Sequence, residues 1–469
     1  MIDKIKPYPQ YKEPGVPWLD AVPCNWKVVR IKTVLRELDR RSPNGEGTLL
    51  SLTRLRGLIP QTEASERMHG AKTLVGYKLY RPGEIVMNRM QAWSGMFGAC
   101  SLPGLVSPDY AVFQIVGAHN VGFVVQRLRA PDLVGQFRLA SRGIGSGFNR
   151  LYTDRFGPIL ITLPPSDDQS AIVRFLNYAN LKLERAIRAN KKLIALLNEQ
   201  KRAIIQQAVT RGLEPNVRFK SSGIPWLGDI PEHWSISRLK FETSDIVDCL
   251  HATPKYREDG QFPAIRTADI ELGKVRIEAV RRVSGDQYAL WTSRLAPQEG
   301  DILYSREGER YGIAALVPAG VQLCISQRMM VFRIRPPQRS SFLMWQLNCQ
   351  HVYSQAAADT IGATSPHVNV ERIKNFLLVL PPPQEQDEIS TWISAHTMSL
   401  DAAIARAHRE VDLLREYRAS LIADVVTGRL DVREAAERLP GRMEEVDVTE
   451  EPPAEDEAEE LLEAVAEDE

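Results

Sequence analysis

Two clusters of polar side chains stand at matching places in this 469-residue chain, each after a run of apolar, β-branched residues. Arginine, asparagine, glutamine and serine are the residue types that bond to base edges and phosphates in the grooves of nucleic acid. Both clusters place an arginine at the same position, Arg89 and Arg306, while the neighbouring residues differ. The candidate contacts are Asn88, Arg89, Gln91, Trp93, Ser107 and Tyr110 in the first cluster, and Arg306, Arg310, Gln327, Arg328 and His367 in the second. Decoration of surface loops is the alternative interpretation of any one of these residues.

Signatures of catalysis are missing from the sequence. It contains no GxxxxGK[ST] phosphate loop, no HExxH and no GxSxG nucleophile elbow. The GIGSG at Gly143–Gly147 lacks the strand-turn-helix context of a nucleotide-binding loop, and we expect a flexible loop near a ligand-facing surface. The eight histidines show no metal-ligand spacing, so no metal site is predicted. His367, in a polar loop, is the histidine that we expect to contact a ligand.

Composition places the chain among globular proteins of a reducing compartment. It has 43% apolar and 25% charged residues, no run near the ~18 apolar residues of a membrane span, and no apolar signal core at its start. The five cysteines are odd in number, scattered and never in a CxxC pair, which disfavours disulfides and zinc ribbons. We expect a cytoplasmic protein without membrane contact.

The charge is distributed unevenly. Fourteen of the 59 acidic residues lie between Met443 and Glu469, where there is no lysine or arginine. This leaves 45 acidic against 59 basic residues in the rest of the chain, so a basic body precedes an acidic tail, which we expect to be disordered. A basic body favours a polyanionic partner. A solvated surface with a solubilising tail is the simpler alternative.

The sequence repeats itself once. Gly15–Lys32 matches Gly223–Lys240 at eight of 18 positions, including both tryptophans, at an offset of 208. Leu163–Leu213 matches Leu380–Leu430 at 15 of 51 positions, at an offset of 217 that also aligns Arg81–Met90 with Gln298–Glu307. A period this long excludes a solenoid and indicates a duplicated two-part unit.

Each copy has the same internal order. A Pro/Trp-rich entry leads into strand-like runs such as GEIVMNR, YAVFQIV, GDILYSR and RMMVFRIR, and a PP pair then opens a long segment without proline or glycine. We predict an α+β fold with a first β-rich domain at residues 1–165, a helix at 166–213, a second β-rich domain at 214–382, a helix at 383–432 and a tail at 433–469.

The two helical segments have coiled-coil periodicity. Apolar residues recur at alternating steps of four and three, as a left-handed seam requires. The seam residues are Leu183, Ile187, Ile194, Leu197 and Ile204 in the first helix, and Leu400, Ile404, Val411, Leu414 and Leu421 in the second. Because the stripes are equivalent, packing against each other as an antiparallel pair is the simplest way to bury both, and docking of each on its own β-rich domain is the alternative. Lys201 and Arg418 occupy the same seam position, where a polar residue fixes register.

The ordered set of motifs resembles the specificity subunits of type I restriction-modification enzymes, over the chain to about Leu430. The residues that carry the resemblance are the entries Gly15–Trp26 and Gly223–Trp234, the strands Gly83–Arg89 and Gly300–Arg306, the helix starts PPSDDQ and PPPQEQ, and the closures Thr210–Leu213 and Thr427–Leu430. The loops Ala363–Val370 and Ser146–Thr153 depart from the family pattern, and the resemblance does not explain the acidic tail.

The resemblance implies a subunit without catalytic activity of its own. In that family each β-rich domain recognises half of a split double-stranded DNA target, and two helices form an antiparallel coiled coil that separates the domains and docks two methyltransferase subunits. Restriction-translocase subunits complete the enzyme. S-adenosylmethionine, ATP and magnesium belong to the partner subunits, and no cofactor is expected in this chain.

Two other functions are possible from the sequence. A fused recognition-methyltransferase protein would need an NPPY or DPPY motif, and the PP pairs here follow Leu163 and Leu380 instead. A coiled-coil scaffold that binds only proteins would not account for the basic body.

Overall fold

The computed structural model describes residues 5–54, 56–64, 73–143, 149–224, 226–278, 280–308, 310–357 and 367–440. The chain forms two compact units, unit 1 from residues 1–189 and 410–469 and unit 2 from residues 190–409. Both boundaries fall within long helices, α5 (Ser166–Arg211) and α11 (Pro383–Val426), so each of these helices begins in one unit and ends in the other. In the described part of the chain, no helix combines the length and apolar character that crossing a bilayer requires.

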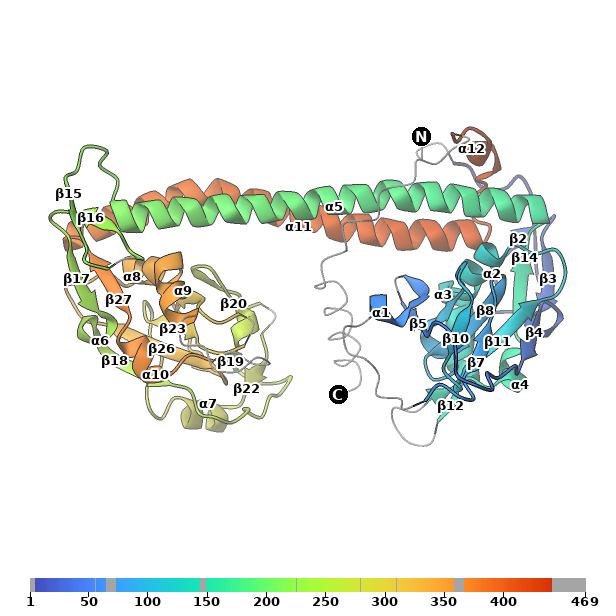
Figure 1. Cartoon of the computed structure of the whole chain (residues 1–469), viewed down its shortest axis with the longest axis horizontal. Helices are drawn as coiled ribbons and strands as arrows, with labels where there is room; N and C mark the ends of the chain where they lie inside the picture. Colours follow the sequence, from blue (N-terminus) through green and yellow to red (C-terminus); the bar gives the residue numbers. More distant parts are fainter. Residues whose placement is uncertain are drawn as a thin grey trace. The chain divides into compact units, whose positions relative to one another are not determined.

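Unit 1 is organised around an antiparallel sheet of order β4-β11-β8-β9. Its strands are β4 (Leu35–Leu38), β11 (Tyr110–Ile115), β8 (Glu84–Asn88) and β9 (Phe97–Gly98). Helix α2 (Val121–Leu128) lies between this sheet and the first part of α5 (Figure 1). Phe123 of α2 and Phe175 of α5 are buried in one core with Phe113 of β11, so the sheet is fixed to the long helix through α2.

Shorter elements complete unit 1. They are β1 (Tyr11–Lys12), β2 (Val22–Pro23), β3 (Lys27–Arg30), η2 (Ile31–Thr33), β5 (Leu50–Thr53), β6 (Gly57–Pro60), α1 (Gln61–Ala64), β7 (Lys78–Tyr80), η3 (Ala92–Ser94), β10 (Gly104–Val106), α3 (Pro131–Ala140), β12 (Arg142–Gly143), β13 (Asn149–Arg150), α4 (Thr153–Phe156), β14 (Leu160–Leu163) and α12 (Arg433–Glu437). The pairs β1·β2, β3·β14, β5·β6, β7·β10 and β12·β13 are all antiparallel.

Unit 2 repeats the same plan with a sheet of order β18-β26-β23-β24. These strands are β18 (Thr243–Asp248), β26 (Met329–Ile334), β23 (Ile302–Ser305) and β24 (Ala314–Leu316). The other elements are β15 (Phe219–Ser221), β16 (Asp229–Pro231), β17 (Ser235–Arg238), α6 (Leu239–Glu242), β19 (Phe262–Ile265), η4 (Thr267–Asp269), β20 (Ile270–Glu271), β21 (Lys274–Val275), β22 (Arg282–Val283), α7 (Gly285–Trp291), β25 (Cys324–Ile325), α8 (Ser340–Leu347), α9 (Gln350–Ala357), α10 (Val370–Lys374) and β27 (Leu377–Leu380).

The strands of the two sheets correspond one to one, so the sequence repeat is also a repeat of structure. Strand β8 corresponds to β23, β9 to β24 and β11 to β26, all at the offset of 217 that aligns the long helices. The predicted duplicated α+β fold is confirmed in this respect. The copies differ between the entry and the central strands, where unit 2 has the three-stranded group β22-β19-β25 and unit 1 has the hairpin β5-β6.

Each tryptophan-containing entry packs beneath the end of a long helix. Trp26 and Trp234 are fully buried. Helix α11 ends before Gly428, and a Cβ built on Gly428 would come within 2.7 Å of Pro23 and 3.3 Å of Trp26. Helix α5 ends before Gly212, where a Cβ would come within 3.4 Å of Trp234. Both glycines have positive φ, the conformation in which a helix C-terminus closes most readily on glycine. The entry of each copy therefore closes on the helix of the other copy.

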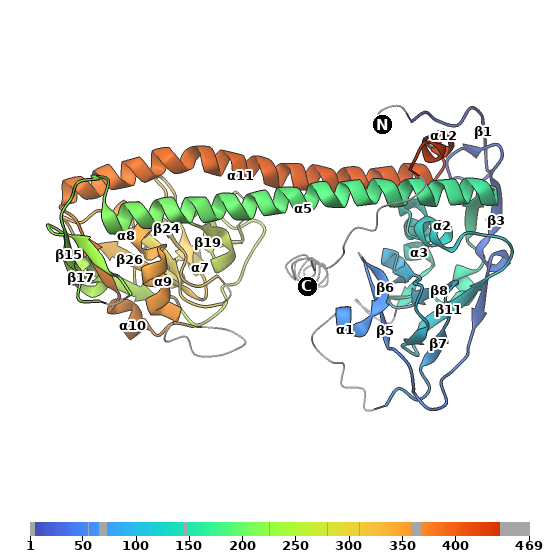
Figure 2. The same ribbon diagram turned by 45° about the horizontal axis from the view of Figure 1, so that its top comes forward.

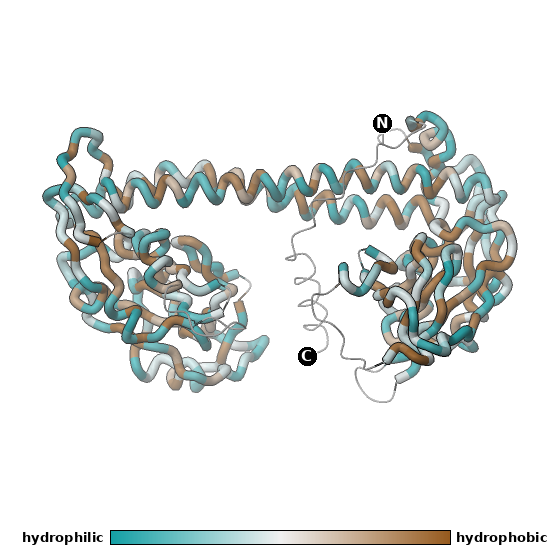
Figure 3. The backbone as a smooth tube through the Cα atoms, in the orientation of Figure 1, coloured by the Kyte–Doolittle hydropathy of each residue, from teal (hydrophilic) through white to brown (hydrophobic). Residues whose placement is uncertain are grey.

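Helices α5 and α11 lie side by side within each unit, as both views of the ribbon show (Figures 1 and 2). Hydrophobic residues recur along both helices between hydrophilic ones, as an amphipathic pair requires (Figure 3). In unit 1, Leu421 and Val425 of α11 share a core with Leu176 of α5, and in unit 2, Ile389 of α11 shares a core with Val209 of α5. The predicted antiparallel packing is confirmed within each unit.

Candidate nucleic-acid interface

Arg306 directly follows β23 and lies inside unit 2 rather than on its surface. Its side chain is 9% exposed, and its Nε lies 3.2 Å from Oδ1 of Asp248 at the end of β18. Its Nη2 also bonds to the carboxylate of Glu307. A poorly solvated guanidinium between two carboxylates has its charge compensated within the protein, and removing it would leave those carboxylates without their partner.

Arg89 makes the equivalent ion pair in unit 1. Its Nη2 bonds to Glu37 on β4, and Glu37 also accepts a hydrogen bond of 2.5 Å from the hydroxyl of Thr153. Glu37 stands opposite Phe113 in the sheet, and Asp248 stands opposite Met330, which aligns with Phe113 at the offset of the repeat. The same ion pair is therefore built into both copies, at the same place in both sheets.

This geometry gives a structural reason for the recurrence of the two arginines. Arg89 joins the end of β8 to the outer strand β4, and Arg306 joins the end of β23 to the outer strand β18. Each arginine so fixes the end of the sheet from which the neighbouring polar side chains project. Direct contact of Arg89 or Arg306 with DNA stays a prediction. Their ion pairs, of which that of Arg306 is buried and that of Arg89 is partly buried, favour a positioning role.

The backbone of each arginine also holds the segment that returns to the sheet. The carbonyl of Arg89 accepts a hydrogen bond of 2.9 Å from the N–H of Leu151, and that of Arg306 accepts one of 3.0 Å from Val368. The preceding residues, Arg150 and His367, are therefore equivalent and lie beside the two ion pairs. Arg150 was not among the candidates, although alignment with His367 at the offset of 217 could have indicated it.

The unit 1 candidates gather around the turn that follows β8. The amide of Asn88 donates to Oε1 of Gln91 at 2.9 Å, and the indole N–H of Trp93 donates to the Met90 carbonyl at 2.8 Å. Tyr110 pairs with Asn88 across the sheet, and the N–H of Tyr110 bonds to the carbonyl of Ser107 at 3.0 Å. Burial raises the pKa of Tyr110, so its hydroxyl stays protonated and neutral at physiological pH. The structure thus brings all these candidates to one edge of the sheet.

Three arginines that are not among the candidates extend this edge. The guanidinium of Arg138 lies 5.7 Å from the ring centre of Trp93. Arg142 and Arg150 stand directly opposite each other in the β12-β13 pair, and Arg150 lies 3.7 Å from Asp109. Like charges directly opposite in a sheet destabilise it, so this pair is better suited to a bound polyanion than to the free protein.

The unit 2 candidates Gln327 and Arg328 occupy the turn between β25 and β26. Arg328 is exposed and has φ 69°, a left-handed conformation that costs energy for a residue with a side chain. The N–H of Arg306 donates to the carbonyl of Arg328 at 3.0 Å, so the buried arginine holds the strained one. The structure therefore presents Arg328 to solvent on a turn fixed from beneath.

Arg310 and His367 lie differently. Arg310 donates to the carbonyl of Ile270 at 2.7 Å and so contacts the β20-β21 hairpin rather than the turn that carries Arg328. His367 pairs with Glu307 through an isolated backbone bridge. The GIGSG loop beyond Gly143, residues 363–366 of the Ala363–Val370 loop and the tail beyond residue 440 lie outside the described residues.

Comparisons with known proteins point to one family. Residues 244–406 match the family model described as the type I restriction modification DNA specificity domain. The specificity subunit of the type I restriction enzyme MjaVIII of Methanocaldococcus jannaschii is 23% identical over 305 residues, which cover 63% of this chain and 68% of the relative. The EcoKI specificity subunit of Escherichia coli is 20% identical over 344 residues, 71% of this chain and 69% of the relative.

The chain carries a type I restriction modification DNA specificity domain, and its relatives point to a specificity subunit. One solved chain, from a study of complex assembly and conformational transition of the type I R-M system, has the same fold, with a TM-score of 0.54, 18% identity, and coverage of 86% of this chain and 98% of that chain. The family model matches the second copy only, and the shared sheet order extends the assignment to the first copy.

This domain supports the predicted role in DNA recognition. In the described part of the chain, no group of three or more histidine, cysteine, aspartate or glutamate side chains is placed to hold a metal ion. All five cysteines are free thiols.

The seam of the specificity subunit carries an ion pair in each unit. Lys201 of α5 donates to Oδ1 of Asp401 on α11 at 2.6 Å, and Arg418 of α11 bonds to Glu184 of α5. The seam arginine and lysine are therefore not lone polar residues, because each has a carboxylate on the facing helix. The seam residues Leu183, Ile187, Val411 and Leu421 are buried, whereas Ile194, Leu197, Ile204, Leu400, Ile404 and Leu414 are partly buried.

Proposed function

We propose that this specificity subunit reads a bipartite DNA target, with unit 1 contacting one half-site and unit 2 the other. The observation that carries the proposal is the repetition of one scaffold with two different surfaces. Both units have the same sheet order and the same arginine-carboxylate pair, but the aligned positions Trp93, Tyr110 and Arg150 of unit 1 are Arg310, Gln327 and His367 in unit 2. Two related modules that read different sequences would share a frame and differ at the contact surface.

The long helices are the proposed spacer. One domain reads only a few base pairs of major groove, so a long target needs two domains held apart. Helices α5 and α11 are each continuous from one unit into the other, and an α-helix rises by about 1.5 Å per residue. In this proposal the length of the helix pair sets the unread gap between the half-sites.

The same helices are the proposed docking sites for two methyltransferase subunits. Leu196 of α5 is 54% exposed and Leu413 of α11 is 64% exposed, and these leucines are equivalent at the offset of 217. A large apolar side chain exposed on an otherwise paired helix is a feature of protein contact sites. Because equivalent leucines are exposed in both units, they support two equivalent docking sites rather than one.

The specificity subunit acts on DNA together with the other subunits of a type I system. We further propose that restriction-translocase subunits are part of the full assembly. S-adenosylmethionine, ATP and magnesium would be bound by the partner subunits, and this chain would need no cofactor. Since its ligand is DNA, we place its action in the cytoplasm.

A gel-shift assay of the subunit co-expressed with a methyltransferase partner tests this function. We expect sequence-specific binding that falls steeply with salt, because phosphate contacts release counterions. Truncation after Arg442 removes the 14 acidic residues of the tail and should leave binding intact or strengthen it. Absence of DNA binding by the full complex would favour a scaffold that binds only proteins, and loss of specific binding on truncation would give the tail a role in recognition.

A further inference from the structure

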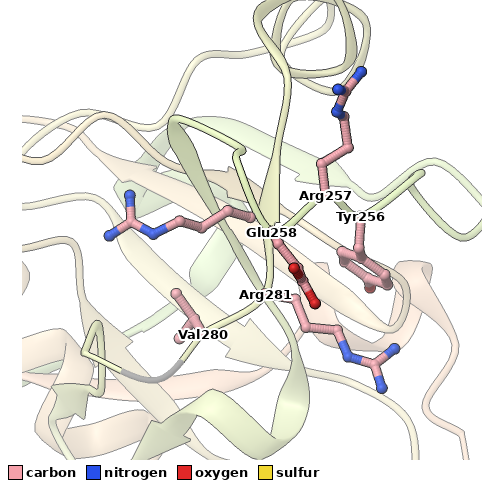
Figure 4. A pocket seen from close by; sticks show the side chains of 6 residues that line it. Tyr256, Arg257, Glu258, Val280 and Arg281 are labelled. Carbon is pink, nitrogen blue, oxygen red and sulfur yellow. The ribbon is translucent and has the colours of Figure 1, made fainter.

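An arginine-lined hollow opens in unit 2 beside the turn that carries Gln327 and Arg328. It measures about 380 Å³ and is lined by Tyr256, Arg257, Glu258, Val280, Arg281 and Arg282 (Figure 4). We call it the arginine hollow. The sequence pattern did not indicate these residues, because they lie between the entry and the central strands, where the two copies do not align.

The floor of the arginine hollow is rigid. Two extended segments are joined by backbone hydrogen bonds, from the N–H of Arg257 to the carbonyl of Arg282 at 2.9 Å and from the N–H of Ala264 to the carbonyl of Arg281 at 2.9 Å. A Cβ built on Gly260 would come within 2.7 Å of the backbone of Arg282, so only glycine allows this close approach. The backbone that carries the side chains of the arginine hollow is therefore held in place.

The guanidinium of Arg281 is pre-organised over an aromatic ring. It lies 5.0 Å from the ring centre of Tyr256, and the hydroxyl of Tyr256 is 2.9 Å from Oγ of the buried Ser326. Stacking holds an arginine in place without occupying its hydrogen-bond donors. Ser326 directly precedes Gln327, so the arginine hollow and the candidate base-reading turn share one support.

The positive charge of the arginine hollow is only partly neutralised by the protein. Arg257 pairs with Asp259, but both side chains are largely exposed and such pairs are weak. Arg282 donates to the neutral carbonyl of Gln261 at 3.0 Å. Among the described residues, no carboxylate lies within ion-pair distance of Arg281 or Arg282. A guanidinium with unoccupied donors can bond to a phosphate through two parallel hydrogen bonds.

We propose that the arginine hollow binds a backbone phosphate of the DNA half-site that unit 2 reads, with Arg281 as the principal contact. This inference rests on the proposed DNA-binding function and assigns the residues that position the duplex. Phosphate contacts fix the register of a protein on DNA, and base contacts supply the sequence information. A phosphate held by Arg281 would set the position of the duplex relative to Gln327 and Arg328.

The test is the salt dependence of binding to a labelled duplex of random sequence, by fluorescence anisotropy, for the subunit co-expressed with a methyltransferase partner. Arg281→Ala should reduce the slope of log K against log salt by about 0.9, the value for one phosphate contact. Arg281→Lys should retain most of the slope. Glu258→Gln should tighten binding, because it removes a negative charge from the arginine hollow.

Lys240→Ala is the matched control, since Lys240 is an exposed cation of the same unit on α6, outside the arginine hollow. An unchanged slope for Arg281→Ala, or an equal reduction for Lys240→Ala, would overturn the assignment while leaving the proposed function intact. Failure of the unmodified complex to bind DNA would instead overturn the proposed function, and this inference with it.

Discussion

Lys201 and Asp401 form an ion pair across the helix seam that the internal repeat builds a second time as Arg418 and Glu184. The repeat offset relates the two cations to each other and the two carboxylates to each other, so each helix supplies the cation in one unit and the carboxylate in the other. Asp401 also accepts a hydrogen bond of 3.1 Å from Lys274 of β21, which joins the β-rich part of unit 2 to α11. Each unit thus has its own register-fixing ion pair between α5 and α11, and unit 2 adds the hydrogen bond from Lys274.

We predict that Asp401→Asn lowers the free energy of unfolding by about 1–3 kcal/mol, because Lys201 is buried and would lose its charged partner. Burial raises the pKa of the Asp401 carboxyl, but the Lys201 and Lys274 ammonium groups outweigh burial and hold that pKa below its usual value. Glu184→Gln is the matched control. It should cost less than ~1 kcal/mol, because the Arg418 pair is more exposed. Urea unfolding followed by tryptophan fluorescence measures both, and equal losses would contradict the difference in burial.

The second prediction concerns His351, which is 4% exposed on α9 and stacks on Trp226 at 6.3 Å between ring centres. Burial lowers the pKa of His351 to about 4, so the folded state binds fewer protons than the unfolded state between pH 6.5 and pH 4. Above this pH range, His351 does not lower the free energy of unfolding. As the pH falls through the range, about 3 kcal/mol of the free energy of unfolding is lost.

His351→Leu should remove this pH dependence, as measured by thermal unfolding at pH 7.5 and pH 4.5. At the offset of 217, His351 of unit 2 aligns with Val134 of unit 1, which carries no titratable group. The dependence should therefore belong to unit 2. If the leucine variant lost the same stability at low pH, the pH dependence would originate from a group other than His351.

The third prediction separates the buried arginine from the exposed one. Arg306→Ala should destabilise the protein by about 1–3 kcal/mol, because Asp248 and Glu307 lose their partner. Arg328→Ala should leave unfolding nearly unchanged and relax one base position in the DNA target, at a cost of ~1–3 kcal/mol in binding. Unfolding curves and target selection distinguish the two roles, and relaxed specificity in an Arg306 variant of normal stability would make Arg306 a base contact.

The fourth prediction is that one substitution stabilises the free protein but weakens its binding to DNA. Arg142→Thr removes one member of the like-charged pair with Arg150, and should stabilise the free protein by ~0.2–1 kcal/mol. The same change should weaken DNA binding, with a smaller salt slope. Thermal unfolding and anisotropy on one preparation measure both effects. A variant that binds DNA as well as the unmodified protein would remove this arginine pair from the interface.

Much of the fold was predictable because the signals were local and repeated. The runs around β8, β11, β23 and β26 combine apolar and β-branched residues with turn residues at their ends, and the long helices carry a seam period over many turns. The expected helix at residues 166–213 is α5 at Ser166–Arg211, and the expected helix at 383–432 ends at Val426.

The chemical roles of the site residues were less predictable, because burial is set by residues far apart in the sequence. Asp248 is equivalent to Glu37 at an offset of 211, not 208 or 217, because β18 has a bulge between Thr243 and Asp245 and pairs with β26 further along than β4 pairs with β11. The sequence alignment therefore did not place the two carboxylates together, and the arginines that they hold resembled surface residues. The arginine hollow lies where the copies share no sequence at all.

The central claim is that two units read two half-sites across a gap set by α5 and α11. It is tested most directly by selecting DNA from a random library with the complex of this subunit and a methyltransferase partner. The variant carries one heptad inserted after Leu197 and one after Leu414, which preserves the seam.

For the unmodified subunit we expect a target of two short blocks separated by an unspecified gap. Seven residues add ~10.5 Å of helix, so the variant should select the same two blocks with a gap about three base pairs longer. A continuous target, or an unchanged gap in a well-folded variant, would contradict the account.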